Sequence, residues 1–243
     1  MASTVSPSVA AVAATAAAAA VDAVAVTDSD MTVIVVQVIA LFATIAFYLS
    51  GSAVCMKIHT QKSTKNVNFL PYMMTFLNCF LWFTYGTLKK DVLLIGVNAI
   101  GFLIQCCYIF IFIQNCELKQ FYLRRVLGMI CFCLFVMSFA YLGDEMYDVR
   151  FSLGWLSFTV TIVMYASPLS TLRDVVRTKS AETVSLPLTL STLVVTWTWT
   201  YYGHLIRDNF VKVPNGLGLF LGLMQLLLFG LYRPVKQQTL LDV

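Results

Sequence analysis

Seven long runs of apolar residues fill the sequence after its first 30 residues, and no Asp, Glu, Lys or Arg interrupts them. A helix needs about 20 residues to cross a hydrocarbon core of ~30 Å, which is close to the length of each run. Helices are expected because lipid cannot satisfy backbone N–H and C=O groups. The runs lie at 32–56, 69–88, 92–114, 126–143, 151–172, 186–206 and 213–232. We therefore predict an all-α polytopic membrane protein with seven transmembrane helices.

The composition favours lipid as the solvent and gives no sign of catalysis. Charged residues are 12% of the chain, against roughly a quarter in soluble domains. The sequence has no Cys/His cluster with zinc spacing, nucleophile elbow or phosphate-binding loop. We expect no metal, no cofactor, no nucleic-acid partner and no enzymatic activity.

The distribution of basic residues predicts the orientation in the membrane. Eleven Lys and Arg residues fall in the connections on one side and five on the other. Because cytoplasmic loops are enriched in Lys and Arg, the N-terminus is predicted to be extracellular or lumenal and the C-terminal tail, 234–243, cytosolic. Residues 1–30 are rich in Ala and carry no Lys or Arg, so we expect a flexible tail rather than a signal peptide. The sequence does not distinguish the plasma membrane from the Golgi membrane.

The first half of the chain matches the second half at a shift of 117 residues. Chance can align scattered Leu and Val residues, but it rarely aligns Trp, Asn, Asp and Gly. Identical pairs include Thr44 and Thr161, Tyr48 and Tyr165, Lys62 and Lys179, Trp82 and Trp199, Tyr85 and Tyr202, Asp91 and Asp208, and Asn98 and Asn215. Pro71 matches Pro187 at a shift of 116.

The repeat predicts the domain organisation. Residues 31–115 and 151–233 form two three-helix repeats, and 116–150 contain a single linker helix with its flanking loops. Because the linker crosses the membrane once, the two repeats have the same orientation. Parallel repeats of this kind, in a 3+1+3 arrangement, are a transporter architecture with the substrate site near the midplane between them.

At these residues the sequence resembles the SWEET (MtN3/saliva) family of sugar transporters, and its animal members in particular. The resemblance covers about 32–233 and rests on the segments 62–71, 77–86, 97–101, 165–169 and 214–218. It implies a facilitative, bidirectional uniporter that moves a monosaccharide, with glucose as the first candidate, by alternating access. A homo-oligomer is implied by the resemblance alone.

Two asparagines and two tryptophans are the predicted substrate-binding residues. Asn98 and Asn215 supply donors and acceptors for sugar hydroxyls, although small polar residues in membranes also form interhelical hydrogen bonds. The resemblance places Trp82 and Trp199 at the pocket, whereas their positions alone also fit an interfacial aromatic belt. One helical turn earlier lie Asn78 and Val195, which we expect to influence pocket size.

The resemblance also implies a gate and a set of hinges. Tyr85 and Asp208 match a family pair that closes the outer side by a hydrogen bond, and Asp91 with Tyr202 is the repeat-related pair. Family members often carry a hinge proline in each of four helices, and the corresponding residues here are Gly51, Pro71, Pro168 and Pro187. Gly51 departs from that pattern, so we expect its hinge to have different mechanics.

Two other classes of protein fit parts of the pattern. A seven-helix receptor would have the same helix count, but the repeat and the absence of DRY-like and NPxxY elements are unexpected for one. In a related carrier of amino acids with a PQ-loop, glutamine would follow the turn prolines, whereas Tyr72 and Leu188 occupy those positions. No carboxylate lies inside an apolar run, so the sequence favours downhill transport over proton coupling.

Overall fold

The computed structural model describes residues 31–142 and 148–232, and within these ranges all regular secondary structure is helical. A first helix covers residues 31–49. It is followed by α2 (Ser52–Gln61), α3 (Leu70–Lys89), α4 (Val92–Asn115), α5 (Lys119–Leu142), α6 (Val149–Met164), α7 (Ala166–Thr178), α8 (Leu186–Leu205) and α9 (Asn209–Leu231). The predicted tails, 1–30 and 234–243, lie outside the described residues.

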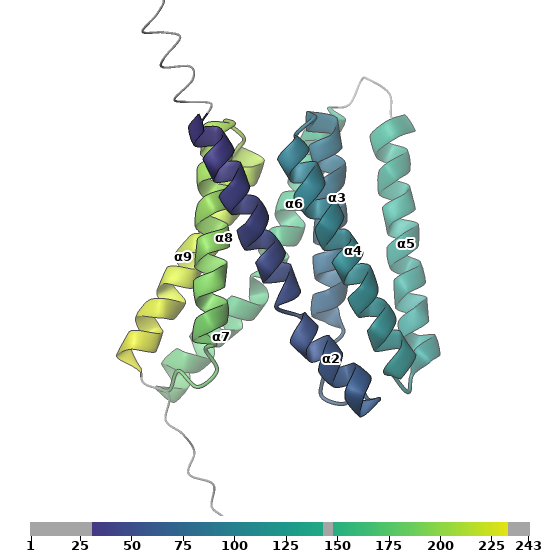
Figure 1. The fold of residues 1–243 in the computed structure, drawn as a ribbon, viewed down its shortest axis with the longest axis vertical. Coiled ribbons are helices and arrows are strands. Elements are labelled where there is room, and N and C mark those ends of the chain that lie inside the picture. Colours follow the sequence, from purple (N-terminus) through teal and green to yellow (C-terminus); the bar gives the residue numbers. More distant parts are fainter. Residues whose placement is uncertain (1–30, 143–147, 233–243) are drawn as a thin grey trace, which may run out of the picture.

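These segments make seven passes between two ends of a bundle (Figure 1). The first helix and α2 form one bent pass, and α6 and α7 form another over Val149–Thr178. Below, the lower end is the one that carries α2 and α7 in Figure 1, and the upper end is opposite. The described chain thus has the predicted seven-helix architecture, in which α5 joins the two halves.

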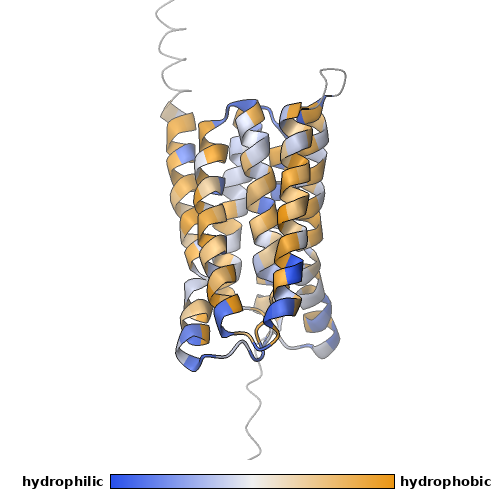
Figure 2. Ribbon diagram, turned by 90° about the vertical axis from the view of Figure 1, so that its right-hand side faces the viewer, coloured by the Kyte–Doolittle hydropathy of each residue, from blue (hydrophilic) through white to orange (hydrophobic). Residues whose placement is uncertain are grey.

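The helices are mostly hydrophobic along their length, and most of the hydrophilic residues lie near the two ends of the bundle (Figure 2). Large side chains such as Phe42, Leu103 and Phe135 are more than 60% exposed, which is expected where lipid replaces water. Five passes are apolar enough by length and composition to span a membrane. The other two passes are α3 and α8, each 20 residues long, which carry more polar and aromatic side chains because they line the centre.

Packing divides the bundle into two similar groups of helices. In the first half α3 packs on α4, in the second α8 packs on α9, and α3 meets α6 where the halves join. The linker helix α5 packs against α3, α4 and α6. The main core runs between the halves at the upper end and includes Leu81, Tyr85, Val97, Leu153 and Tyr202.

Two helices begin four or more residues earlier than the apolar runs indicate. Helix α5 begins at Lys119 rather than 126, because its first turns carry Arg124 and Arg125 on a helix that extends beyond the apolar region. Helix α9 begins at Asn209 rather than 213, because the Asp208 carboxylate caps it by accepting a hydrogen bond from the Phe210 N–H.

The turns between the second and third helices of the two halves have the same construction. Lys90 and Arg207 have positive φ, 56° and 54°, and each is followed by an aspartate. The Asp91 N–H donates to the Gly86 carbonyl oxygen, and the Asp208 N–H donates to that of Gly203, both at 2.9 Å. Each helix therefore ends in a left-handed residue, and the next begins at an aspartate N-cap.

The close approach of α8 and α9 requires glycine at position 203. A Cβ atom at Gly203 would lie 2.6 Å from the backbone nitrogen of Lys212. We expect Gly203→Ala to destabilise the folded protein by about 1–3 kcal/mol, because backbone must move to relieve the overlap. Gly96→Ala is the matched control, since a Cβ there meets nothing within 4 Å and Ala favours a helix. Thermal unfolding in detergent tests this, and equal stability of the two variants would contradict it.

Candidate functional site

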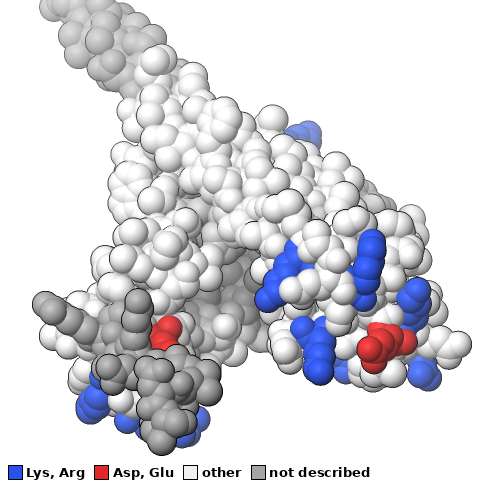
Figure 3. Space-filling view, turned by 60° about the horizontal axis from the view of Figure 1, so that its bottom comes forward, with Lys and Arg blue, Asp and Glu red and all other residues white. Residues whose placement is uncertain are grey.

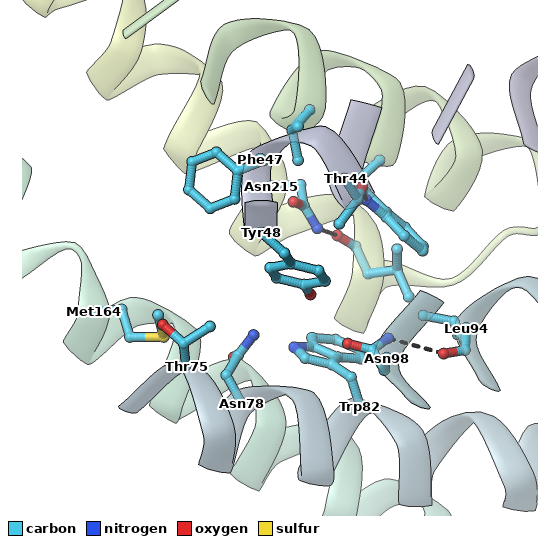
Figure 4. A pocket seen from close by; sticks show the side chains of 13 residues that line it. Thr44, Phe47, Tyr48, Thr75, Asn78, Trp82, Leu94, Asn98, Met164 and Asn215 are labelled. Atoms are coloured by element: carbon cyan, nitrogen blue, oxygen red, sulfur yellow. Dashed lines mark hydrogen bonds between the residues drawn. The ribbon is translucent and has the colours of Figure 1, made fainter. Parts of the chain in front are cut away.

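A cavity of about 200 Å³ lies between the two repeats. Thirteen side chains line it, and Figure 4 shows how they converge from both halves of the chain. The lining comprises Thr44, Phe47, Tyr48, Thr75, Asn78, Trp82, Leu94, Asn98, Met164, Val195, Trp199, Val211 and Asn215. All six predicted substrate-binding residues are in this set, and none of the thirteen side chains is charged.

The two predicted asparagines are held in the same way on α4 and α9. Nδ2 of Asn98 donates to the Leu94 carbonyl oxygen at 2.9 Å, and Nδ2 of Asn215 donates to that of Val211 at 2.8 Å (Figure 4). These bonds fix each amide without using its oxygen, and no described residue donates to either Oδ1. The cavity thus has two oriented amide oxygens, one from each repeat, that can accept hydrogen bonds.

Each tryptophan is held by the opposite repeat. Nε1 of Trp82 on α3 donates to Oγ1 of Thr161 at 3.1 Å. Nε1 of Trp199 on α8 donates to Oγ1 of Thr44, on the first helix, at 2.8 Å. Because these bonds occupy both indole N–H groups, only the ring surfaces remain for a ligand. Both side chains are buried, with 6% exposure, which excludes a place in an interfacial belt.

One wall of the cavity is more polar than its counterpart. The Thr161 hydroxyl contacts Oδ1 of Asn78 at 2.8 Å, and the Asn78 side chain points toward the cavity (Figure 4). The repeat-related residue is Val195, which cannot hydrogen-bond. The amides and indole rings of the site therefore occur in both repeats, whereas the polar side chain of Asn78 has no polar counterpart in the second repeat.

The prediction of the site omitted the threonine partners and the tyrosine beside them. Thr44, Thr161 and Tyr48 all fall on repeat-matched positions, so the signal was present in the sequence. It could not be used, because the sequence does not show that the first helix of one repeat faces the second helix of the other.

Two tyrosine–aspartate hydrogen bonds join the repeats above the cavity. The Tyr85 hydroxyl donates to Oδ2 of Asp208 at 2.7 Å, and the Tyr202 hydroxyl donates to Oδ2 of Asp91 at 2.8 Å. Both tyrosines are 2% exposed. Since each aspartate also caps a helix through Oδ1, the pairs are held in place by the same turns that connect the helices.

The pair at Asp208 has an additional cation. Nζ of Lys89 lies 3.2 Å from Oδ2 of Asp208, whose side chain is only 2% exposed. Ile206 occupies the repeat-related position next to the other pair. The lysine was not among the predicted gate residues, and the repeat could not identify it because it has no basic counterpart.

At the lower end the two halves separate. Among the described residues, the hydrogen bonds and ion pairs that join the repeats lie at the level of the cavity or above it. The helices diverge below (Figure 1), and the surface seen from that end is hollowed between them (Figure 3). This conformation is closed above the cavity and open below it.

The four predicted hinge residues occupy two kinds of position. Gly51 lies at the break between the first helix and α2, and Pro168 follows the break between α6 and α7. Pro71 and Pro187 stand in the first turn of α3 and α8, where proline is compatible with a straight helix. Pro214 inside α9 is a further position at which a helix can bend, and the prediction did not single it out.

The described residues contain no group of three His, Cys, Asp or Glu side chains that could hold a metal ion. The polar groups of the cavity are neutral amides and hydroxyls, which suit a neutral ligand rich in hydroxyls better than an ion.

Comparison with a solved structure agrees with this arrangement. A structure described as a eukaryotic SWEET transporter superposes with a TM-score of 0.78 at 30% sequence identity. The match covers 84% of this chain and 98% of the other, so it includes both repeats and the linker.

Sequence relatives lead to the same group. The sugar transporter SWEET1 of Drosophila pseudoobscura pseudoobscura is 34% identical over 80% of this chain and 87% of its own. The bidirectional sugar transporter SWEET1a of Oryza sativa subsp. japonica is 36% identical over 84% and 75%. The family model described as "sugar efflux transporter for intercellular exchange" matches twice, at residues 34–120 and 151–237. The chain therefore belongs to the SWEET (MtN3/saliva) family, as its sequence motifs indicated.

Proposed function

We propose that this protein is a facilitative, bidirectional uniporter for a monosaccharide, with glucose as the first candidate. The observation that carries the proposal is the uncharged cavity between the repeats, with duplicated amides and indole rings and a duplicated closure above it. Relatives named as sugar transporters support the substrate class. Because the chain belongs to this family of transporters, we do not expect it to be an enzyme.

The lining suits a sugar ring in both chemistry and size. A monosaccharide has hydroxyls around its rim and C–H groups on its faces. The amides of Asn98 and Asn215 can bind the rim, while the rings of Trp82 and Trp199 can cover the faces. The cavity of about 200 Å³ is below the ~300–1,000 Å³ typical of pockets for drug-sized ligands, which favours one sugar ring over two.

The absence of charge in the lining supports uniport. A proton-coupled carrier commonly has an Asp, Glu or His side chain inside the membrane, and an amino acid carries two charges that require charged partners. The thirteen lining residues provide neither. Asp91 and Asp208 lie above the cavity and are engaged by tyrosines. A carrier that moves a neutral solute down its gradient is therefore favoured over an amino-acid carrier. A seven-helix receptor is disfavoured because the chain belongs to a family of transporters.

Alternating access would require the upper contacts to break while the lower ends approach one another. The Tyr85–Asp208 and Tyr202–Asp91 bonds form the upper gate, and Lys89 strengthens the first of them. The breaks near Gly51 and Pro168 allow the lower parts of two passes to move against their upper parts. Pro71 and Pro187, at the lower ends of α3 and α8, complete the proposed hinge set.

We also propose that the lower end faces the cytosol. The described basic residues of that end gather on α2, the first turns of α5, α7 and the connections beside them (Figure 3), as the positive-inside rule requires. The N-terminus is then extracellular or lumenal, in the plasma membrane or the Golgi membrane. The proposal also includes the division of the chain into two repeats, at 31–115 and 151–233, with a linker between them, and the assembly of the protein into a homo-oligomer.

Removing either cavity amide should impair transport. We expect Asn98→Ala and Asn215→Ala each to lower the initial rate of glucose entry into proteoliposomes about tenfold at subsaturating glucose, the effect of losing one or two ligand hydrogen bonds. Asn115→Ala is the matched control, because Asn115 makes the same bond to the carbonyl oxygen four residues earlier, at 2.7 Å, away from the cavity. Equal rates in all four proteins would return Asn98 and Asn215 to a packing role.

Loss of one gate hydroxyl should expose the cavity from above. A cysteine introduced as Val195→Cys is expected to react with an impermeant thiol reagent from the lower side and to be protected from the upper side. Adding Tyr85→Phe removes the 2.7 Å bond to Asp208 and should raise the rate of upper-side labelling several-fold. The same proteins without Val195→Cys provide the blank for native cysteines. Unchanged upper-side labelling would contradict the gate assignment.

A further inference from the structure

A second, larger cavity lies outside the transport pathway. It is a groove of about 900 Å³ at the lower end, between α2 and the last turns of α4. The bend near Gly51 creates it, because α2 turns away from the axis of the first helix (Figure 1). None of the residues that line this groove lines the cavity between the repeats.

The groove changes from apolar to polar along its length. Met56 on α2 and Phe110 on α4 line it and are each 63% exposed, so they present apolar surface to the bilayer. Lys62, which follows α2, and Asn115, which ends α4, line the other part. An apolar wall that leads to a basic, polar end is complementary to a phospholipid, whose acyl chain meets its phosphate at the membrane interface.

The charges around the groove are predominantly positive. The lower ends of α2, α4 and α5 and the connections between them form one lobe, on which several basic side chains surround a single acidic one (Figure 3). The basic residues are Lys57, Lys62, Lys65, Lys119, Arg124 and Arg125, and the acidic residue is Glu117. Among the described residues of the opposite lobe, Arg173, Arg177 and Lys179 are nearly balanced by Asp174 and Glu182. This asymmetry favours an anionic ligand on the first lobe.

In the second repeat, a tyrosine side chain lies at the position that corresponds to the polar end of this groove. Tyr232 is the repeat counterpart of Asn115, and Lys179 is the counterpart of Lys62. Nζ of Lys179 donates to the Tyr232 hydroxyl at 3.1 Å and lies 5.1 Å from the ring centroid. No described residue forms a hydrogen bond or ion pair with Nζ of Lys62. The first repeat therefore has a groove and an available cation at this position, whereas in the second repeat Tyr232 is present and binds the Lys179 ammonium.

We propose that the groove between α2 and α4 binds one anionic phospholipid, with its phosphate at Lys62 and an acyl chain against Met56 and Phe110. The lipid belongs to the leaflet at the lower end. It would occupy in the first repeat the space that Tyr232 occupies in the second.

Native mass spectrometry of the full chain, released from bilayers of equal phosphatidylglycerol and phosphatidylcholine, tests the proposal. The wild type should retain one phosphatidylglycerol in preference to phosphatidylcholine. Lys62→Gln should lower that retention about fivefold, the weight of one basic residue beside an anionic lipid. Asn115→Tyr should abolish it by reproducing the arrangement of the second repeat. Lys179→Gln, the repeat-matched control, should leave it unchanged.

Glucose entry by each variant reports whether it is folded, and we expect all three to retain it. Equal retention of the two lipids by the wild type would overturn the proposal. So would undiminished phosphatidylglycerol in a folded Asn115→Tyr protein, or an equal loss in Lys179→Gln. If Asn115→Tyr instead changed the number of chains in the particle, the groove would be an interface between copies rather than a lipid site.

Discussion

Two tryptophan–threonine hydrogen bonds connect the repeats at the level of the cavity, and the arrangement of the site depends on them. Trp82 donates to Thr161 and Trp199 donates to Thr44, so each repeat orients an indole ring of the other. An indole N–H left unpaired in a buried site would cost about 1–3 kcal/mol, which ties this register to the folded state. The same register brings tyrosines and aspartates together one turn above.

The duplication supplies the shape of the site, and departures from it give the two sides different properties. Asn78 and Val195 occupy matched positions in the two repeats, so the cavity wall is polar on the side of Asn78 and apolar on the side of Val195. Lys89 has Ile206 as its counterpart, so Asp208 forms an ion pair in addition to its hydrogen bond with Tyr85, whereas Asp91 has no such cation at the matched position. Charge at a nearly buried carboxylate strengthens that contact. The proposed upper gate therefore has two contacts between the repeats at Asp208 and one at Asp91.

Much of the fold could be predicted because membrane-spanning helices require long apolar runs and because an internal repeat is detectable as sequence similarity between the two halves. Uninterrupted apolar runs located the seven passes, and the 117-residue shift identified the two repeats. The start of α5 was placed too late, since hydropathy marks the edge of the lipid and a helix can extend into water. The break of the first pass at Gly51 was named as a hinge, but its division into two helices was not foreseen.

The sequence predicted six residues that line the cavity, but not the hydrogen bonds that hold them. Asn98 and Asn215 are rare polar residues at matched positions, which made them visible. The roles of Thr44 and Thr161 depend on which helices face one another across the repeat interface, and hydropathy contains no such information. Lys89 was missed for the opposite reason, because symmetry cannot reveal a residue that breaks it.

The central claim is that one site is exposed alternately to the two sides and moves glucose without a coupling ion. Counterflow in proteoliposomes tests this most directly. Vesicles loaded with unlabelled glucose should transiently accumulate labelled glucose above its external concentration, to the same extent with and without a proton gradient. Labelled glucose that only rises to equality, at a rate independent of the internal sugar, would indicate a pore. Accumulation that requires the gradient would indicate coupling, and either result would contradict the account.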